Sequence, residues 1–160
     1  MINKAIISGG TGLVGQSVAR YLANNGVDVL CIGRSTLLSS SVYEMFGKGV
    51  TYLKLDINDL SDLDNKIKNI KWEPGSNCVF YHFAWSGNKR LSDGSPEEQL
   101  KNVTSSSLAI KAAKKLVVQS LLILELSRKL MLNGISRWVL NLTHLKVTML
   151  LPNLHQETCV

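Results

Sequence analysis

A run of glycines, Gly9-Gly10-Thr11-Gly12-Leu13-Val14-Gly15, constrains the fold of this chain more than any other feature. An apolar stretch at 4–8 precedes the run and predicts a buried strand, and apolar residues at helical spacing over 16–25 follow it. In that setting Gly9 permits a tight turn, Gly12 lets backbone approach a pyrophosphate, and Gly15 lets helix and strand pack closely. The N–H groups near 11–13 would face that pyrophosphate with a partial positive charge. The alternative is a glycine-rich turn that binds no ligand.

Strands and helices alternate after the glycine run. Further strands are expected at 27–32, 50–55 and 78–83, and helices at 59–70 and 95–116. Ser95-Pro96 is typical of a helix start, because serine caps the helix and proline suits its first turn. Alternation with short joints predicts a parallel sheet wrapped by helices, which is an α/β fold.

The character of the chain changes after Leu116. Eleven of the twelve glycines lie in the first 116 residues, whereas residues 117–160 contain twelve leucines and two acidic residues. These leucines keep neither a helical nor a strand period, so no further strand–helix unit is expected there. We predict a dinucleotide-binding half-domain over 1–116, with its sheet truncated after about four strands, and a leucine-rich tail over 117–160.

Composition and charge limit the partners. Hydrophobic residues make up 45% and charged residues 19%, which is usual for a soluble globular protein. The net charge is +6, but the basic residues are scattered and no aromatic residues interleave with them. We therefore expect no specific nucleic-acid binding, whereas a mildly cationic surface would suit an anionic substrate.

The cysteines and the apolar runs indicate a cytoplasmic protein. Cys31, Cys78 and Cys159 have no metal-ligand spacing and form no even-numbered disulfide framework, so no metal site is expected. The N-terminus shows no signal-peptide pattern, and the apolar run 121–124 is far too short to cross a membrane.

The segment Ser8–Gly15 resembles the Gly-x-x-Gly-x-x-Gly fingerprint of extended short-chain dehydrogenases/reductases, the NAD-dependent epimerase/dehydratase family that acts on nucleotide sugars. The resemblance covers residues 1 to about 116. It implies a Rossmann-type parallel sheet with flanking helices. It also implies cofactor contacts from the fingerprint residues Gly9, Thr11, Gly12, Leu13, Val14 and Gly15.

Three further segments match this family. Asp56-Ile57-Asn58-Asp59 resembles its Asp-x-x-Asp after the third strand, which implies that Asp56 and Ile57 lie at the adenine; a helix cap is the alternative for Asp56. The segment 81–85 resembles its His-Leu-Ala-Ala, which implies that Phe83, Ala84 and Trp85 lie beside the cofactor. His82 is given no acid–base role. Asn102-Val103 matches the Asn-Val of the next helix, and Asn102 is either a site residue or a solvated helix residue.

The end of the second strand bears on the choice of cofactor. An enzyme that binds NAD usually has an acidic residue there to bind the ribose hydroxyls. This chain instead has Arg34-Ser35, and a guanidinium suits a 2′-phosphate, so NADP is favoured over NAD. The alternative for Arg34 is an ordinary surface residue.

The catalytic residues that the resemblance implies are missing. The family uses a Tyr-x-x-x-Lys pair, in which the lysine lowers the pKa of the tyrosine so that it can act as a base. The four tyrosines, at 21, 43, 52 and 81, are followed four residues later by Asn25, Gly47, Asp56 and Trp85. No catalytic residue is therefore assigned.

A frameshift near Leu116 would explain the tail. If each original codon used the last base of one present codon and the first two of the next, 117–127 can decode as Gly-Cys-Ser-Lys-Phe-Ile-Asn-Ser-Gly-Thr-Ile. In the same frame 148–159 permits Tyr-Ala-x-Ser-Lys, which contains the missing pair. The alternative is a divergent but genuine C-terminal segment.

The prediction for function is an NAD(P)-binding fragment of a nucleotide-sugar epimerase, dehydratase or reductase, inactive in the given form. The substrate of the intact enzyme would be a nucleotide sugar, and whether that enzyme is a homodimer stays open. Two alternatives remain. One is a non-catalytic NADP-binding redox sensor, and the other is a non-functional truncated product.

Overall fold

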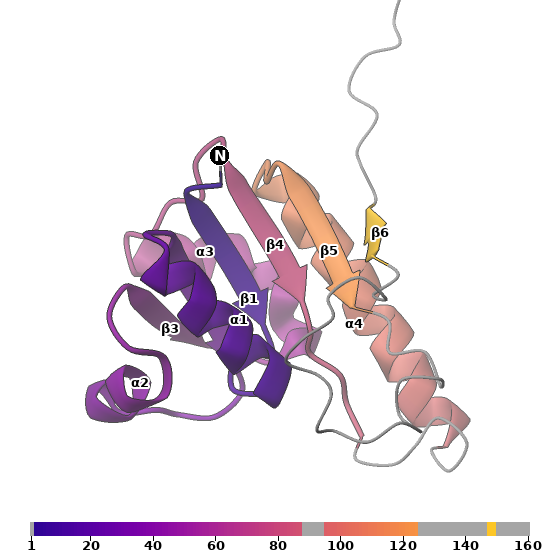
Figure 1. The fold of residues 1–160 in the computed structure, drawn as a ribbon. Coiled ribbons are helices and arrows are strands. Elements are labelled where there is room, and N and C mark those ends of the chain that lie inside the picture. The colour runs from indigo at the N-terminus through magenta and orange to yellow at the C-terminus, as the bar shows by residue number, and fades with distance from the viewer. Residues whose placement is uncertain (1, 88–94, 125–146, 150–160) are drawn as a thin grey trace, which may run out of the picture.

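The computed structural model of the chain describes residues 2–87, 95–124 and 147–149. They form one sheet in the order β3-β2-β1-β4-β5-β6 (Figure 1). The first five of these strands run parallel, and β6 pairs antiparallel with β5. The strands are β1 (Lys4–Ser8), β2 (Asp28–Gly33), β3 (Val50–Lys54), β4 (Cys78–His82), β5 (Ser120–Leu124) and β6 (Val147–Met149).

Helices connect the parallel strands and cover both faces of the sheet (Figure 1). They are α1 (Leu13–Asn24), α2 (Ser39–Phe46), the 3₁₀ helix η1 (Ile57–Asp62), α3 (Leu63–Asn69) and α4 (Pro96–Lys115). One apolar core packs Ala19 of α1 and Phe46 of α2 against the sheet. The other packs Leu63 of α3 and Ala109 of α4 against the opposite face. The predicted α/β class, a Rossmann-type parallel sheet with flanking helices, is confirmed.

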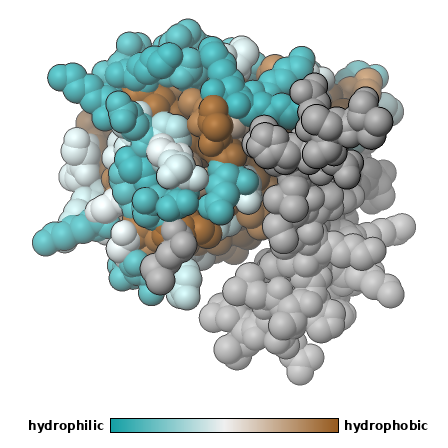
Figure 2. All heavy atoms as spheres, turned by 90° about the horizontal axis from the view of Figure 1, so that it is seen from above, coloured by the Kyte–Doolittle hydropathy of each residue, from teal (hydrophilic) through white to brown (hydrophobic). Residues whose placement is uncertain are grey.

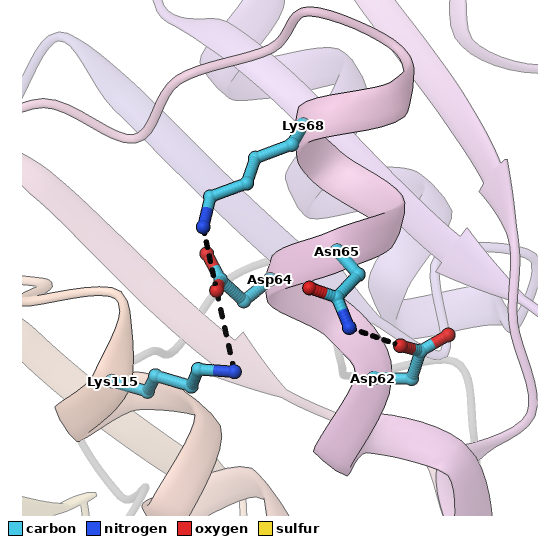
Figure 3. Close-up of polar contacts among 5 residues, drawn as sticks. All are labelled: Asp62, Asp64, Asn65, Lys68 and Lys115. Carbon is cyan, nitrogen blue, oxygen red and sulfur yellow. Dashed lines mark hydrogen bonds and ion pairs between the residues drawn. The ribbon is translucent and has the colours of Figure 1, made fainter.

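An ion pair joins α3 to α4 (Figure 3). The Asp64 carboxylate lies 3.0 Å from Lys68 Nζ in the same helix and 3.3 Å from Lys115 Nζ at the end of α4. The two ammonium groups lower the pKa of Asp64, the hydrogen bond from Lys68 contributing most. The carboxylate thus bridges two helices that are far apart in sequence.

The register of the strands brings their carboxyl ends to one edge. Ser8 at the end of β1 pairs with Ile32 on one side and His82 on the other, and Gly33 pairs with Lys54. The strand order runs outward in both directions from β1, so the connections after β1 and β4 leave on opposite faces. Such a switch point is where open parallel sheets bind their ligands.

The sheet extends further than the sequence predicts. The expectation of a sheet truncated after about four strands is corrected by β5, which lies parallel to β4 in register from Val79↔Ser120 to His82↔Ile123. A strand buried in a parallel sheet is a continuous apolar run, so the Leu-Leu-Ile-Leu of β5 carries no alternation that would distinguish it from the rest of the tail. The strand β5 thus lies within 117–160, the segment expected to be a tail.

Two helical segments also differ from the expectations. The helix α2 was not predicted; its last turn is held from α1 by Arg20, whose Nη2 donates to the Glu44 carbonyl, and by Gln16, whose Nε2 donates to the Met45 carbonyl. These contacts satisfy terminal carbonyls that a short helix leaves open, and a sequence period does not reveal them. The helix expected over 59–70 is divided into η1 and α3.

Hydrophilic side chains cover much of the described surface in the view of Figure 2, with hydrophobic ones showing between them. No helix in the described ranges is long and apolar enough to cross a membrane.

Candidate dinucleotide site

The glycine run forms a tight loop between β1 and α1. Gly9 has φ +76°, and a Cβ on it would lie 2.7 Å from the backbone nitrogen of Ala84. A Cβ on Gly15 would collide with the Gly9 carbonyl oxygen and lie 2.9 Å from Gly10 Cα. The loop is therefore closed so tightly that these two positions have no room for a side chain.

The first turn of α1 is open to an external acceptor. Gly12 is the N-cap, no side chain caps the helix, and the first turn contains no acidic residue. The first helical hydrogen bond is donated by Gln16 N–H to the Gly12 carbonyl at 2.8 Å. The N–H groups of Leu13, Val14 and Gly15 precede that bond, and such groups at a helix N-terminus suit a phosphate.

Two further glycines pack around this loop in a way that the spacing of the motif does not reveal. A Cβ on Gly10 would lie 2.8 Å from Cys31 Sγ in β2. A Cβ on Gly33 would lie 2.7 Å from the Tyr52 hydroxyl and 3.3 Å from Thr11 Cγ2. Gly33 thus marks the point where the glycine loop meets the end of β2, and only the three-dimensional packing shows it.

Arg34 and Ser35 follow β2 directly and are exposed. Arg34 lines a surface hollow of about 510 Å³ together with Lys54, Asp56 and Asp59. Within the described ranges the Arg34 guanidinium makes no hydrogen bond or ion pair. Its donors are therefore available to an anionic group.

Asp56 caps the start of η1. A helix cap is the alternative that the sequence analysis gives for this residue. Its Oδ1 accepts hydrogen bonds from the Asn58 N–H at 2.9 Å and from Asn58 Nδ2 at 2.8 Å, at the start of η1. The carboxylate also borders the hollow that Arg34 lines, so capping leaves it at the same edge of the sheet. Ile57 is half-buried and packs against the core beneath it.

The segment after β4 approaches the glycine loop from the other side. Phe83 N–H donates to the Ser8 carbonyl at 3.0 Å, and Ala84 lies against Gly9. Trp85 is half-exposed at this edge. The structure therefore places Phe83 and Ala84 against the end of β1 and the glycine loop. That Phe83, Ala84 and Trp85 lie beside a cofactor stays a prediction.

Asn102 is buried in α4 and holds the segment after β4. Its Oδ1 accepts from Ser86 N–H at 2.7 Å, and its Nδ2 donates to the Ser86 carbonyl at 3.0 Å. Both ends of the amide are thus bonded to one backbone position next to Trp85. The side chain is therefore not a solvated helix residue; it positions the loop that carries Trp85, and its contact with a cofactor stays a prediction.

Ser8 and His82 form a buried pair beneath the glycine loop, with Ser8 Oγ 2.6 Å from His82 Nδ1. Burial lowers the pKa of His82 to about 4, so the ring is neutral near pH 7. Its Nε2 is buried and has no hydrogen-bond partner within the described ranges. The ring thus packs as a neutral side chain between β1 and the end of β4.

Neither Tyr52 nor Tyr81 has an environment that suits a base. Burial raises the pKa of both Tyr52 and Tyr81, whereas a catalytic phenolate needs a lowered one. Burial also raises the pKa of the Cys31 and Cys78 thiols to about 12, so neither is an activated nucleophile. The described residues contain no group of three or more His, Cys, Asp or Glu that could hold a metal ion. The segment 148–159, where a shifted frame permits Tyr-Ala-x-Ser-Lys, lies almost wholly outside the described residues.

A known protein family has a sequence pattern that matches most of this chain. A model of the NAD dependent epimerase/dehydratase family matches residues 5–125. No curated protein sequence matches the chain.

Solved structures share the fold at low sequence identity. The UDP-glucose 4-epimerase of Thermotoga maritima, solved with UDP-glucose, has a TM-score of 0.57 and 20% identity over 75% of this chain and 37% of its own. The Bordetella bronchiseptica enzyme WbmG in complex with NAD has a TM-score of 0.58 and 22% identity over 77% of this chain and 37% of its own. The Thermus thermophilus UDP-glucose 4-epimerase in complex with NAD has a TM-score of 0.57 and 18% identity over 74% and 36%. The chain thus spans little more than a third of the length of these enzymes.

Proposed function

Because the chain belongs to the NAD-dependent epimerase/dehydratase family, we propose that it binds a nicotinamide dinucleotide at the carboxyl edge of its sheet. The observation that carries this proposal is the uncapped first turn of α1 behind a loop closed by Gly9 and Gly15. The N–H groups of 13–15 would hold the pyrophosphate, and the helix dipole would favour its negative charge. The segment 83–85 would lie at the nicotinamide side, and Asp56 at the adenine side.

The cofactor we propose is NADP. The turn after β2 offers the Arg34 guanidinium and the Ser35 hydroxyl and has no acidic residue that would bind the two ribose hydroxyls of NAD. Guanidinium groups bind phosphate through two parallel hydrogen bonds, which gives both affinity and orientation. Two of the similar enzymes named above were solved with NAD, so this preference would distinguish the chain from them.

The intact enzyme would act on a nucleotide sugar. Support comes from the family match and from similar structures solved with UDP-glucose, or with NAD and UDP. The bound cofactor supplies hydride transfer to or from the sugar. The residues of this chain would bind and orient the cofactor, and none of its tyrosines stands in a Tyr-x-x-x-Lys pair to move the proton.

We further propose that the coding frame changes near Leu116 and that the present chain is catalytically inactive. The absence of the Tyr-x-x-x-Lys pair and its reappearance in one shifted frame support this. A cytoplasmic location is proposed on the two buried thiols Cys31 and Cys78, which are free and suit a reducing compartment.

Binding of NADP and NAD to the purified chain tests the main proposal. We expect NADP to bind more tightly than NAD in isothermal titration calorimetry. The substitution Arg34→Ala should weaken NADP binding by roughly 10- to 100-fold, because a hydrogen bond to a charged group contributes about 1.5–3 kcal/mol. It should leave NAD binding unchanged within about twofold, since NAD has no 2′-phosphate for Arg34 to bind.

Lys48→Ala is the matched control for this experiment. It removes the same charge from an exposed residue in the connection between α2 and β3. An equal loss of NADP affinity in both variants would show that general charge, and not a site at Arg34, attracts the cofactor. If neither dinucleotide binds to the folded chain, the proposed function is wrong.

A further inference from the structure

The turn that carries Arg34 and Ser35 is tied to the sheet by a tyrosine in the neighbouring strand. The Tyr52 hydroxyl in β3 donates a hydrogen bond of 2.7 Å to the Ser35 carbonyl oxygen. Tyr52 is half-buried and packs against the core between the sheet and α1 and α2. Burial, followed by the nearby Cys31, raises the pKa of this hydroxyl, so it stays protonated and remains a donor across the physiological range.

The hydroxyl reaches this carbonyl because the residue before the turn is a glycine. Gly33 pairs with Lys54 at the end of β2, and a Cβ on it would lie 2.7 Å from the Tyr52 oxygen. The same Cβ would lie 3.3 Å from Thr11 Cγ2 in the glycine loop. The Tyr52 hydroxyl thus occupies space at the junction of β2, the turn and the pyrophosphate loop.

Fixing one carbonyl also fixes the donor on the far side of its peptide. The peptide unit is planar and trans, so a Ser35 carbonyl that points to Tyr52 directs the Thr36 N–H the opposite way. Without the hydrogen bond, the peptide could rotate and turn its carbonyl oxygen outward. A carbonyl facing a phosphate would repel it, whereas an N–H would bind it.

We propose that Tyr52 is a positioning residue for cofactor selectivity: it holds the Arg34–Thr36 turn in the orientation that accepts a 2′-phosphate. This inference rests on the proposed NADP preference and names a residue that does not itself touch the cofactor. The 2′-phosphate would be met by donors of one turn, and the tyrosine would act on them only through the Ser35 carbonyl.

The experiment compares Tyr52→Phe with the parent chain and with Tyr21→Phe. Tyr21 is exposed on α1, so that control makes the same chemical change away from the turn. The dissociation constants of NADP and NAD are measured on the same preparation of each protein. Their ratio does not depend on the folded fraction, since both ligands bind only the folded chain. We expect Tyr52→Phe to lower the preference for NADP about three- to tenfold, an effect of one hydrogen bond, and Tyr21→Phe to leave it unchanged.

The outcomes distinguish a failure of the role proposed for Tyr52 from a failure of the proposed NADP preference. If the parent chain prefers NAD, the NADP proposal fails. If the parent prefers NADP and Arg34→Ala removes the preference but Tyr52→Phe does not alter it, the role of Tyr52 is wrong. A purely structural role would weaken both dinucleotides equally. If Tyr52→Phe fails to fold, Tyr52→His replaces it, because its shorter ring cannot reach the Ser35 carbonyl. The same loss of preference for NADP over NAD is then expected of Tyr52→His.

Discussion

Gly9 has a positive φ and also lacks space for a Cβ. Comparison with Gly26, which has only the positive φ, separates the two effects. Both have positive φ, +76° and +80°, but a Cβ on Gly26 meets nothing within 4 Å, whereas one on Gly9 meets the backbone of Ala84 and Phe83. We expect Gly26→Ala to cost about 1–2 kcal/mol of unfolding free energy, from the backbone conformation alone. Gly9→Ala should cost about 1–3 kcal/mol more, because the backbone must shift. Urea denaturation measures both.

Dinucleotide binding adds a second readout to this pair of variants. Gly9→Ala should lower the affinity more than tenfold, because the shift moves the loop, whereas Gly26→Ala should retain it. Equal behaviour of the two alanine variants would contradict the closed-loop geometry.

His82 makes stability depend on pH in a defined window. Its pKa is about 4 in the folded chain and about 6.5 when unfolded, so the unfolded state binds more protons between these values. The contribution of the neutral His82 ring to the free energy of unfolding is fully present above about pH 6.5 and is lost as the pH drops toward 4. Between pH 7 and pH 5, protonation of His82 in the unfolded state should lower the free energy of unfolding by about 2 kcal/mol. In His82→Asn the loss over that interval should shrink by this amount; an unchanged dependence would show that the ring titrates normally.

Sequence reasoning located residues at the site more successfully than it assigned their contacts. The glycine spacing placed Gly9 and Gly15 in one loop because the positive φ of Gly9 and the contact of Gly15 with the Gly9 carbonyl are local. The contact of Gly9 with Ala84 is not local, and the spacing does not reveal it. The contact of Gly10 with Cys31 likewise depends on a neighbouring strand. For Asn102, a motif match supplied the position, but its double hydrogen bond to Ser86 depends on the path of the chain after β4.

At the scale of elements, the Asp64 bridge gives one ion pair within a helix and one between helices. Removing Lys115, which joins α4 to α3, should lower the urea midpoint more than removing Lys68, whose partner lies four residues away in its own helix. Both are tested as Lys→Met. Because the pKa of Asp64 is lowered on folding, this stabilisation is present above its unfolded pKa and is lost as the pH falls through its folded pKa. The difference between variants and parent should therefore shrink as the pH falls below the unfolded pKa of Asp64.

Lys111→Met provides the reference for these variants. Lys111 is exposed on α4 and has no ion pair within the described ranges, so its removal should leave the midpoint nearly unchanged. A Lys115→Met midpoint equal to that of Lys111→Met would mean that the bridge between the helices contributes nothing.

The elements that sequence reasoning missed are those whose stability comes from elsewhere. The short helix α2 depends on Arg20 and Gln16 of α1 for its terminal carbonyls, and β5 depends on β4 for its pairing. The elements it found, such as β1 and α4, carry their own signals: an apolar run that ends in glycine, and a serine–proline start.

At the scale of the whole molecule, the proposed change of reading frame can be tested on the gene itself. The coding DNA should be resequenced through codon 116 and well beyond codon 160. We expect a single-base change to restore Tyr-x-x-x-Lys and to open a long downstream frame. A confirmed frame without such an alternative would reject the frameshift and favour a dinucleotide-binding module without catalysis.

The central position of β1 has a consequence for synthesis on the ribosome. This first strand pairs with β2 from Lys4↔Asp28 but with β4 only from Lys4↔Cys78. One side of it therefore stays open until β4 has left the exit tunnel. The face that carries Ile6 also waits for α3 and α4, which are made much later, whereas Ile7 packs in the core that α1 and α2 cover. Folding of such long-range parallel pairs is slow and exposes apolar surface meanwhile. The nascent chain should thus need chaperone protection longest at its own first residues.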